Sequence, residues 1–232
     1  MLTATLIGDV VDSRESGDRA HLHERLTATL AGVNRRHAPT LPLRITVGDE
    51  FQGRFGTVAQ ALAASLELRL ALLPAHDLRH GIGWGEVTVL DDDPRVEDGP
   101  GWWAARDAIH HVQEAEERPA SRSRRTAFVA APAAGSERGL ADGLADALAG
   151  AAGAVNAALV LRDHVVGGLD ERSLAILRGL LAGTSQRDLA AGLGVTPSAI
   201  SQRIRADGLA ALVESERLLT GAVPGADTRL AP

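Results

Sequence analysis

The chain has 232 residues, a formal net charge of −6 at pH 7 and a hydrophobic content of 45%, enough to bury one large core or two smaller ones. It contains no cysteine, which excludes disulfides, thiolate metal sites and cysteine nucleophiles. All 24 basic residues are arginine, which excludes lysine Schiff bases and a P-loop.

The N-terminal sequence, MLTATLIGDV, lacks a basic region and is typical of a strand, not of a signal peptide. The chain contains no run of about 18 uncharged apolar residues, so we expect no helix that spans a membrane. These two observations favour a cytoplasmic protein without a membrane partner.

The first half of the chain predicts a strand, a helix, a hairpin and a second helix. LTATLIGDVV is an apolar, β-branched run of strand length, and residues 18–37 carry leucines at helical spacing. PLRITV and FQGRF predict two short strands joined by a tight turn at Gly48. Residues 57–73 predict a strong amphipathic helix for which Thr57 is the N-cap.

The next segments continue the alternation. LRHGIGWGEVTVL predicts one long strand, whose glycines indicate a bend or the close approach of another backbone or a ligand. DDDPRVEDGPG predicts a loop, WWAARDAIHHVQEAEE a helix and TAFVAA a short strand, while residues 131–168 predict a weak helix plus a connection. This order predicts an α+β sandwich with helices covering one face of a single sheet.

The charge distribution supports a division into domains. Residues 1–169 contain 17 arginines against 23 acidic residues, whereas the remainder contains 7 of each and is therefore relatively basic. We expect four segments: an α+β domain at 1–135, an Ala/Gly-rich helix and connection at 136–168, an all-α helix-turn-helix domain at 169–220, and a flexible tail at 221–232.

The C-terminal domain carries the signals of three short helices. Asp170 can cap a first helix that ends at Gly183, and a second helix lies near Gln186–Leu193. Gly194 can adopt the positive φ of a tight turn, and Thr196 then caps a third helix that begins with a proline. This pattern predicts a helix-turn-helix, and it resembles the modules of MarR-like regulators and of sigma-factor region 4.

The exposed face of the third helix is small and polar, which suits the major groove of DNA. The alternative is a three-helix packing module that touches no nucleic acid. Helix-turn-helix proteins pair two half-sites through a dimer, so we expect a homodimer. The residues that we expect to contact base edges or phosphates are Ser198, Ser201, Gln202, Arg203 and Arg205.

Two acidic motifs, IGDVVDS and VGDEFQG, follow apolar strands near the N-terminus. Neighbouring strand ends can bring Asp9 and Asp49 within a few ångströms, where the carboxylates repel unless a proton or a cation lies between them. Oxygen ligands favour Mg²⁺ or Mn²⁺, with a phosphate as the usual further ligand. The alternative is that both residues only cap turns, but two such motifs together favour a metal or phosphate site.

These motifs carry a resemblance to a known fold. The strand–helix–hairpin order, with Asp9 on the first strand and GDEF at the hairpin, resembles the palm of class III nucleotide cyclases and diguanylate cyclases. This implies a ferredoxin-like, nucleotide-cyclase palm-like sandwich. IGDVVDS, GDEFQG and DGPGWWAARDAI more specifically resemble the SatD family, whose members can carry a C-terminal helix-turn-helix.

The resemblance implies roles for individual residues. Asp9 and Asp49 correspond to the metal carboxylates, and Arg106 corresponds to a catalytic arginine that stabilises transition-state charge. The residues expected around a nucleotide or phosphate are Val10 and Val11, through their backbone N–H groups, and Ser13, Gly48 and Glu50.

The chain also departs from the cyclase pattern. Ile45 stands where cyclases have a base-reading lysine, Trp102 replaces an asparagine, and Val47 replaces the extra glycine of the diguanylate pattern. The metal carboxylates remain while the base-reading groups do not. We therefore expect a DNA-binding transcriptional regulator that binds a divalent metal and a nucleotide or phosphorylated ligand. The alternatives are a nucleotide-processing, cyclase-like enzyme with altered base specificity, and a degenerate palm used only for dimerisation.

Overall fold

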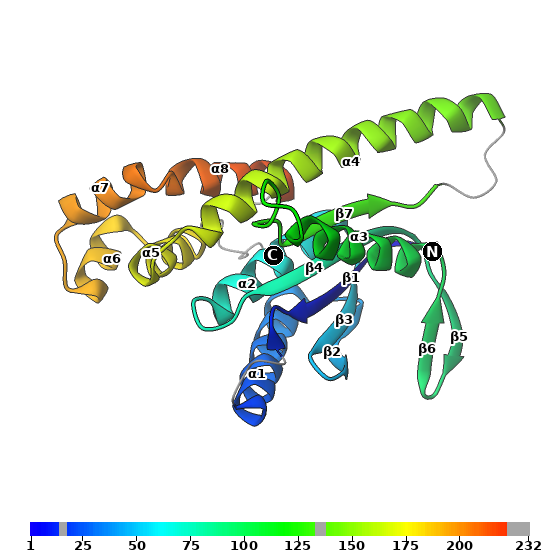
Figure 1. Cartoon of the computed structure of the whole chain (residues 1–232), viewed down its shortest axis with the longest axis horizontal. Helices are drawn as coiled ribbons and strands as arrows, with labels where there is room; N and C mark the ends of the chain where they lie inside the picture. The colour runs from blue at the N-terminus through cyan, green and yellow to red at the C-terminus, as the bar shows by residue number, and fades with distance from the viewer. Residues whose placement is uncertain (14–17, 133–137, 222–232) are drawn as a thin grey trace, which may run out of the picture. The chain divides into compact units, whose positions relative to one another are not determined.

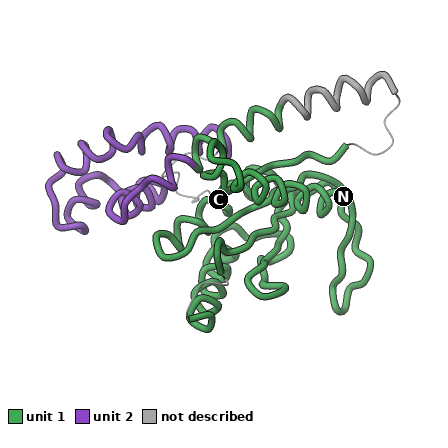
Figure 2. The backbone as a smooth tube through the Cα atoms, viewed as in Figure 1, with its two compact units in different colours: residues 1–163 green, residues 164–232 purple. Residues whose placement is uncertain are grey.

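The computed structural model describes residues 1–13, 18–132 and 138–221, with the backbone alone for residues 138–150 (Figure 1). Its contacts divide the chain into two compact units, residues 1–163 and 164–232 (Figure 2). The expected tail, except for its first residue, and part of the expected connection lie outside the described residues.

The first unit is built on a five-stranded sheet with the order β2-β3-β1-β4-β7, in which β1 is central. All neighbouring strands are antiparallel except β4 and β7, which run parallel. The five strands are β1 (Leu2–Val10), β2 (Leu41–Val47), β3 (Glu50–Phe55), β4 (Leu78–Glu86) and β7 (Thr126–Ala130).

Helices cover both faces of this sheet, so the prediction that they cover only one face was wrong. α1 (Arg19–His37) and α2 (Val58–Leu72) each bury three leucines in one core cluster with Leu6 of β1. α3 (Pro100–Glu116) packs in a separate cluster against Ile7, which is the next residue along β1. Successive side chains of a strand point to opposite faces, so the two clusters lie on opposite sides of the sheet.

The glycines of β4 allow α3 to approach the sheet closely. A Cβ atom at Gly83 would lie 2.2 Å from the carbonyl oxygen of Gly101 and 2.4 Å from the backbone nitrogen of Ala105. The hydroxyl of Thr5 donates a hydrogen bond to the same Gly101 carbonyl at 2.7 Å. Of the explanations that the sequence left open for these glycines, the close approach of another backbone is correct.

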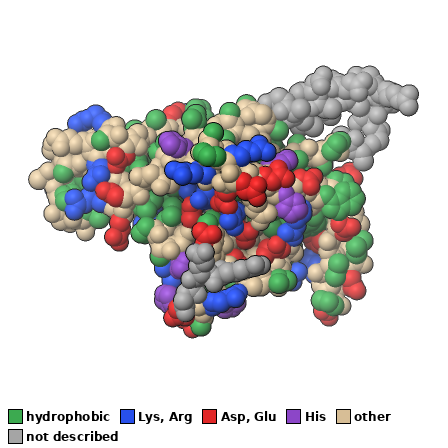
Figure 3. Space-filling view, in the orientation of Figure 1, with side chains coloured by type: hydrophobic (Ala, Val, Ile, Leu, Met, Phe, Trp, Pro, Cys, Tyr) green, Lys and Arg blue, Asp and Glu red, His purple; other side chains and the backbone are tan. Residues whose placement is uncertain are grey.

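The long strand predicted over residues 78–90 is two strands in different sheets. β4 ends at Glu86, and β5 (Thr88–Asp92) pairs with β6 (Arg95–Asp98) in a separate hairpin, where the sequence predicted a loop. The apolar side chains exposed on this hairpin are visible in Figure 3. A nearly buried ion pair of 3.1 Å between Glu97 of β6 and Arg54 of β3 connects the hairpin to the main sheet.

Helix α4 (Arg138–Gly167) is a single helix of 30 residues, longer than the predicted weak helix. Leu159 is fully buried in the core cluster of α1 and α2. Asn156 accepts a hydrogen bond from the backbone N–H of Phe128 at 3.0 Å and donates to its carbonyl at 2.7 Å. Asp163 accepts from the backbone N–H of Thr126 at 2.6 Å. Polar side chains of α4 are therefore bonded directly to β7.

The second unit contains the end of α4 and four further helices. Ile200 and Ile204 of the third predicted helix are buried, as expected. Gly194 adopts the left-handed conformation with a φ of 64° between two of the helices, also as predicted. The helices are α5 (Glu171–Leu181), α6 (Gln186–Leu193), α7 (Pro197–Ala206) and α8 (Leu209–Thr220).

Side-chain caps fix where several helices begin. Thr57 and Gln60 form a reciprocal capping box at the start of α2, with both hydrogen bonds at 3.2 Å. Asp170 accepts from the backbone N–H of Ser173, and Thr196 accepts from that of the third residue in α7. All three predicted caps are confirmed. Among the described residues, the helices are too short or too polar to cross a bilayer.

Candidate functional site

Asp9 lies one residue before the end of β1 and is held by two side chains. One carboxylate oxygen accepts a hydrogen bond from Arg79 at 3.1 Å, and the other accepts from Gln113 of α3 at 3.1 Å. Burial raises the pKa of Asp9, although Arg79 and Gln113 both act to lower it, and the negative charge of Asp49 raises it further. The ionised form of Asp9 is therefore maintained at a cost in free energy.

Asp49 reaches the same end of the sheet from the β2–β3 hairpin. Gly8 of β1 lies opposite Phe51 of β3 in the antiparallel register, which brings the hairpin turn beside the last residue of β1. One Asp49 carboxylate oxygen accepts a hydrogen bond from the backbone N–H of Val10 at 3.1 Å. Gly48 makes the turn with a φ of 64°. The structure thus places both predicted metal carboxylates at one end of the sheet.

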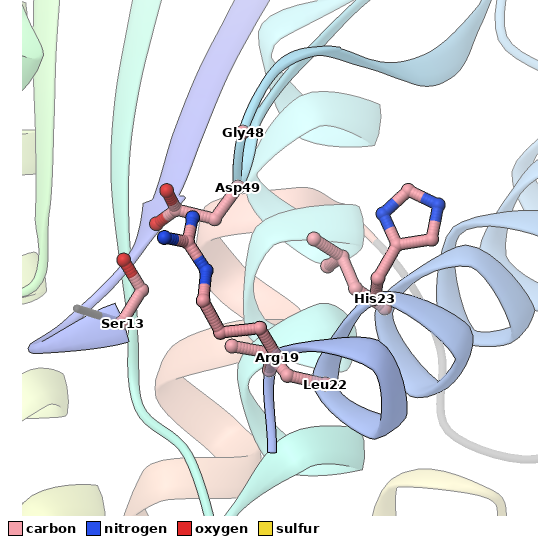
Figure 4. Close-up of a pocket in the computed structure, with 7 residues that line it drawn as sticks. Ser13, Arg19, Leu22, His23, Gly48 and Asp49 are labelled. Carbon is pink, nitrogen blue, oxygen red and sulfur yellow. The ribbon is translucent and has the colours of Figure 1, made fainter. Parts of the chain in front are cut away.

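A small hollow of about 150 Å³ lies between this hairpin and the start of α1. Arg19, the first residue of α1, extends toward the Asp49 carboxylate, and the Ser13 hydroxyl points toward them from the opposite side (Figure 4). The hollow therefore combines a carboxylate, a guanidinium and a hydroxyl. Its lining residues are Ser13, Arg19, Leu22, His23, Leu26, Gly48 and Asp49.

Arg106 of α3 and Glu50 of β3 form a two-point ion pair. The guanidinium donates to the two carboxylate oxygens at 2.8 Å and 3.1 Å, and the Glu50 hydrogen bond raises the pKa of Arg106. Both side chains remain partly exposed, so the pair contributes about 1 kcal/mol or less to stability. The predicted catalytic arginine is thus paired with a predicted ligand residue.

The other predicted phosphate donors are engaged within the fold. The N–H of Val10 bonds to Asp49, and the N–H of Val11 donates to the carbonyl of Asp77 at 3.0 Å. Binding of a phosphate at these two groups therefore requires their present bonds to be exchanged. Ser13 is 8% exposed and lines the hollow, so its hydroxyl is the predicted phosphate contact that the geometry favours most.

The acidic pair fits one type of metal site. Within the part of the chain that the structure describes, His, Cys, Asp and Glu side chains form no group of three or more that could hold a metal ion. A site built from three or more of these side chains is therefore absent from the described residues. Two carboxylates do fit Mg²⁺ or Mn²⁺, which is commonly held by one or two carboxylates while phosphate oxygens and water fill the other positions.

His80 of β4 lies fully buried beneath the site. Its ring meets Phe51 edge to face, with centroids 5.9 Å apart, and both of its nitrogens lack a hydrogen-bond partner. Burial, assisted by the positive charges of Arg162 and Arg69, lowers the pKa of His80 to about 3. This histidine is therefore neutral in the folded protein at physiological pH.

The predicted DNA-contacting residues all lie on α7 but differ in their exposure and in their partners. Ser198, Gln202 and Arg205 are exposed, and Arg205 donates to the half-buried Ser201 hydroxyl at 2.8 Å. Arg203 instead forms an ion pair of 3.0 Å with Asp170 at the start of α5. Arg203 therefore also connects two helices of the module.

Sequence reasoning missed several residues around the acidic pair. Arg19 and His23 line the hollow, and Arg79 and Gln113 hold Asp9. Arg79 lies two residues before the first glycine of β4, and a charge near the start of this mostly apolar strand was the signal available in the sequence.

The five-stranded sheet with helices on both faces, and the acidic pair at one end of the sheet, define the first unit as an α+β sandwich domain. The chain belongs to the SatD family, whose family model matches residues 3–129. A search of curated proteins finds no match.

Solved structures similar to this chain include nucleotide cyclase domains. The guanylyl cyclase Cya2 is 17% identical with a TM-score of 0.40, over 48% of this chain and 70% of that one. A dimeric guanylyl cyclase domain of the RhoGC fusion protein from the aquatic fungus Blastocladiella emersonii is 16% identical with a TM-score of 0.38, covering 47% and 73%. The adenylyl cyclase CyaB from P. aeruginosa is 14% identical with a TM-score of 0.35, covering 45% and 69%. Identities this low carry no activity over to this chain.

Proposed function

We propose that the protein is a DNA-binding transcriptional regulator whose first unit binds a divalent cation together with a nucleotide or another phosphorylated ligand. The observation that carries this proposal is the combination, in one chain, of an acidic pair beside a polar hollow with a helix-turn-helix whose third helix exposes polar side chains. Ligand occupancy of the first unit would control DNA binding by the second.

The charges at the hollow support the ligand half of the proposal. A cation between Asp9 and Asp49 offsets the repulsion and burial that raise the pKa of Asp9. Arg19 extends toward the Asp49 carboxylate and supplies a positive charge that suits a phosphate bound to the same cation (Figure 4). Mg²⁺ or Mn²⁺ would supply charge neutralisation and a bridge to phosphate oxygens, and the side chains would position both.

The base-reading positions of a cyclase are occupied differently here, which favours binding over cyclisation. Ile45 packs against the main core cluster, and Trp102 is 9% exposed in the cluster of α3. Neither side chain is available to recognise a base by hydrogen bonds. Arg106 is engaged by the Glu50 carboxylate and would have to exchange this partner to contact a ligand. The enzyme alternative therefore requires another way to orient the nucleotide.

The second unit supports the DNA half of the proposal. Gln202 and Arg205 are exposed on the same helix whose Ile200 and Ile204 are buried, so their side chains are available to bases and phosphates. A dimer would present two copies of this helix to neighbouring half-sites. The partners are therefore DNA, a second copy of the chain and a phosphorylated ligand.

A thermal-shift experiment tests the ligand half. The chain is heated with each nucleoside triphosphate, with and without Mn²⁺, and saturation at about 100 times the dissociation constant should raise Tm by about 5 °C. Asp49→Asn should lose the shift, whereas Asp107→Asn, an exposed control on α3, should keep it. The absence of any shift would refute ligand binding, and a cyclic product detected by mass would favour the enzyme alternative.

Fluorescence anisotropy with labelled duplexes tests the DNA half. Promoter DNA from the neighbourhood of its own gene should bind more tightly than scrambled DNA, with an affinity that falls as salt rises. Arg205→Ala should weaken binding about tenfold, while Arg217→Ala, which removes a guanidinium paired with Glu214 on α8, should change it little. Equal binding of both duplexes by all variants would refute sequence-specific recognition.

A further inference from the structure

Seven charged side chains form an unbroken row of ion pairs between Asp9 and helix α4. We call these residues the ion-pair row. Its six contacts are Asp9–Arg79 (3.1 Å), Arg79–Glu116 (2.6 Å), Glu116–Arg125 (2.9 Å), Arg125–Asp77 (2.8 Å), Asp77–Arg69 (2.6 Å) and Arg69–Asp163 (3.2 Å).

Every interior member of the row is shared between two partners of opposite charge. The side chains from Arg79 to Asp77 in the row are between 16% and 21% exposed. Arg69 and Asp163, at the α4 end, are almost completely buried. Partly buried charges are poorly screened by salt, so the strength of each pair depends on how its neighbours are engaged. Such a row can pass on a change made at one end.

The far end of the row holds α4 in place. The Asp163 carboxylate is 0% exposed and accepts from the backbone N–H groups of Arg125 and Thr126 at 2.7 Å and 2.6 Å. It also contacts Arg69 at 3.2 Å and Arg162 at 3.5 Å. A buried carboxylate is stable only when opposite charges and hydrogen bonds balance its charge. The strength of the Arg69–Asp163 ion pair therefore affects how firmly α4 is bound to the sheet.

We infer that cation binding at Asp9 strengthens the attachment of α4 through the ion-pair row. A divalent cation draws the Asp9 carboxylate away from Arg79, which then pairs with Glu116 alone. Because each later member is also shared between two partners, the contacts then weaken and strengthen in turn along the row. The Asp77–Arg69 pair weakens, and the Arg69–Asp163 pair becomes stronger. This inference rests on the proposed function, since it assumes a cation at Asp9.

The consequence for the proposed regulator lies in the continuity of α4. This helix continues from Asp163 in the first unit to Gly167 in the second, the unit that contains the helix-turn-helix. Local unfolding of α4 near this point therefore affects residues of both units. A cation-dependent change in the free energy of this unfolding gives the ligand site a physical means of influencing the DNA-binding unit.

Hydrogen exchange of the full-length chain, read by mass spectrometry, tests the inference. Peptides from residues 152–163 should exchange at least about fivefold more slowly in saturating MnCl₂. Glu116→Gln should bind Mn²⁺ but lose this response, because its contact with Arg125 is an ion pair without hydrogen-bond geometry and depends on the charge. The matched control is Glu67→Gln, which removes a carboxylate paired with Arg36 and His37 outside the row and should keep the response.

Electron paramagnetic resonance of free Mn²⁺ separates failure of this inference from failure of the proposed function. If Mn²⁺ binds and exchange in α4 is unchanged, or if Glu116→Gln responds like the wild type, the inference is overturned and the cation site remains. If Mn²⁺ does not bind, the proposed cation site fails. Asp9→Asn then tests the row without metal, because it removes the negative charge paired with Arg79, and unchanged exchange in α4 would again overturn the inference.

Discussion

Replacement of His80 should remove a large part of the protein's sensitivity to acid. His80 is fully buried, and both ring nitrogens lack partners. The folded protein therefore offers no hydrogen-bond acceptor for the N–H that protonation of the ring would add. Burial and the charges of Arg162 and Arg69 lower the pKa of His80 to about 3. In the unfolded chain the same imidazole titrates near pH 6.5, at its ordinary value.

The sign and size of the effect follow from these two values. A group whose pKa is lowered by folding contributes its full stabilisation above the unfolded pKa and loses it as the pH falls toward the folded pKa. Between pH 7 and pH 5 the unfolded chain gains about 0.7 of a proton at His80, while the folded protein gains almost none. The free energy of unfolding should therefore fall by about 2 kcal/mol from this group alone.

Urea denaturation of the wild type and of His80→Phe at the two pH values measures this contribution. Phenylalanine keeps the ring that packs against Phe51 but cannot bind a proton. The wild type should lose about 2 kcal/mol more than the variant between pH 7 and pH 5, since titrations elsewhere are common to both. His111→Phe, an exposed control, should behave as the wild type does. Equal losses in wild type and His80→Phe would refute the buried neutral histidine.

Three further predictions concern packing, the attachment of α4 and the cation. Gly83→Ala should destabilise the protein by about 3 kcal/mol in urea denaturation, because the new methyl group meets the backbone of α3. Gly153→Ala, where no atom lies within 4 Å, should instead stabilise it by about 0.8 kcal/mol. Asn156→Ala should cost about 2 kcal/mol, because two backbone groups of Phe128 lose their partners. Mn²⁺ affinity, measured by calorimetry, should fall as the pH is lowered toward the raised pKa of Asp9, because protons compete for that carboxylate.

A specific experimental result would contradict each of these predictions. Equal stability of the two glycine variants would show that α3 does not approach β4 as closely as described. An Asn156→Ala variant as stable as the wild type, with unchanged exchange at Phe128, would show that α4 is held by apolar contacts alone. An affinity for Mn²⁺ that does not fall as the pH is lowered, while the protein stays folded, would remove Asp9 from the cation site.

Most elements of the fold were predictable because their signals are local. The cap at Thr57, the positive φ at Gly194 and the hairpin at Gly48 each depend on residues only a few positions apart. The errors concern long-range partners. Thr5 resembles a residue on a solvent-facing strand surface, yet its hydroxyl bonds to Gly101 of α3, 96 residues later. Glu97 belongs to a charged stretch that reads as a loop, but it pairs with Arg54 in another strand.

The candidate site was predictable to a similar extent. Asp9 and Asp49 were identifiable because each follows a glycine at the end of an apolar strand. Arg79 and Gln113 are 70 and 104 positions from Asp9, and only the folded sheet and helix bring them to it. Arg19 is one of 24 basic residues, and nothing in its local sequence distinguishes it. Sequence therefore located the carboxylates but not the groups that compensate their charge.

The hydrogen bonds of Asn156 have a consequence for how the first unit can be isolated. β7 is the last strand of its sheet, and Asn156 occupies both backbone groups of Phe128, which face away from β4. Strands with open backbone groups are templates for pairing with other chains, so α4 protects this sheet against aggregation. The family match ends at residue 129, but a fragment cut there would expose β7 and self-associate. The shortest fragment of the first unit that does not self-associate should extend to Asp163.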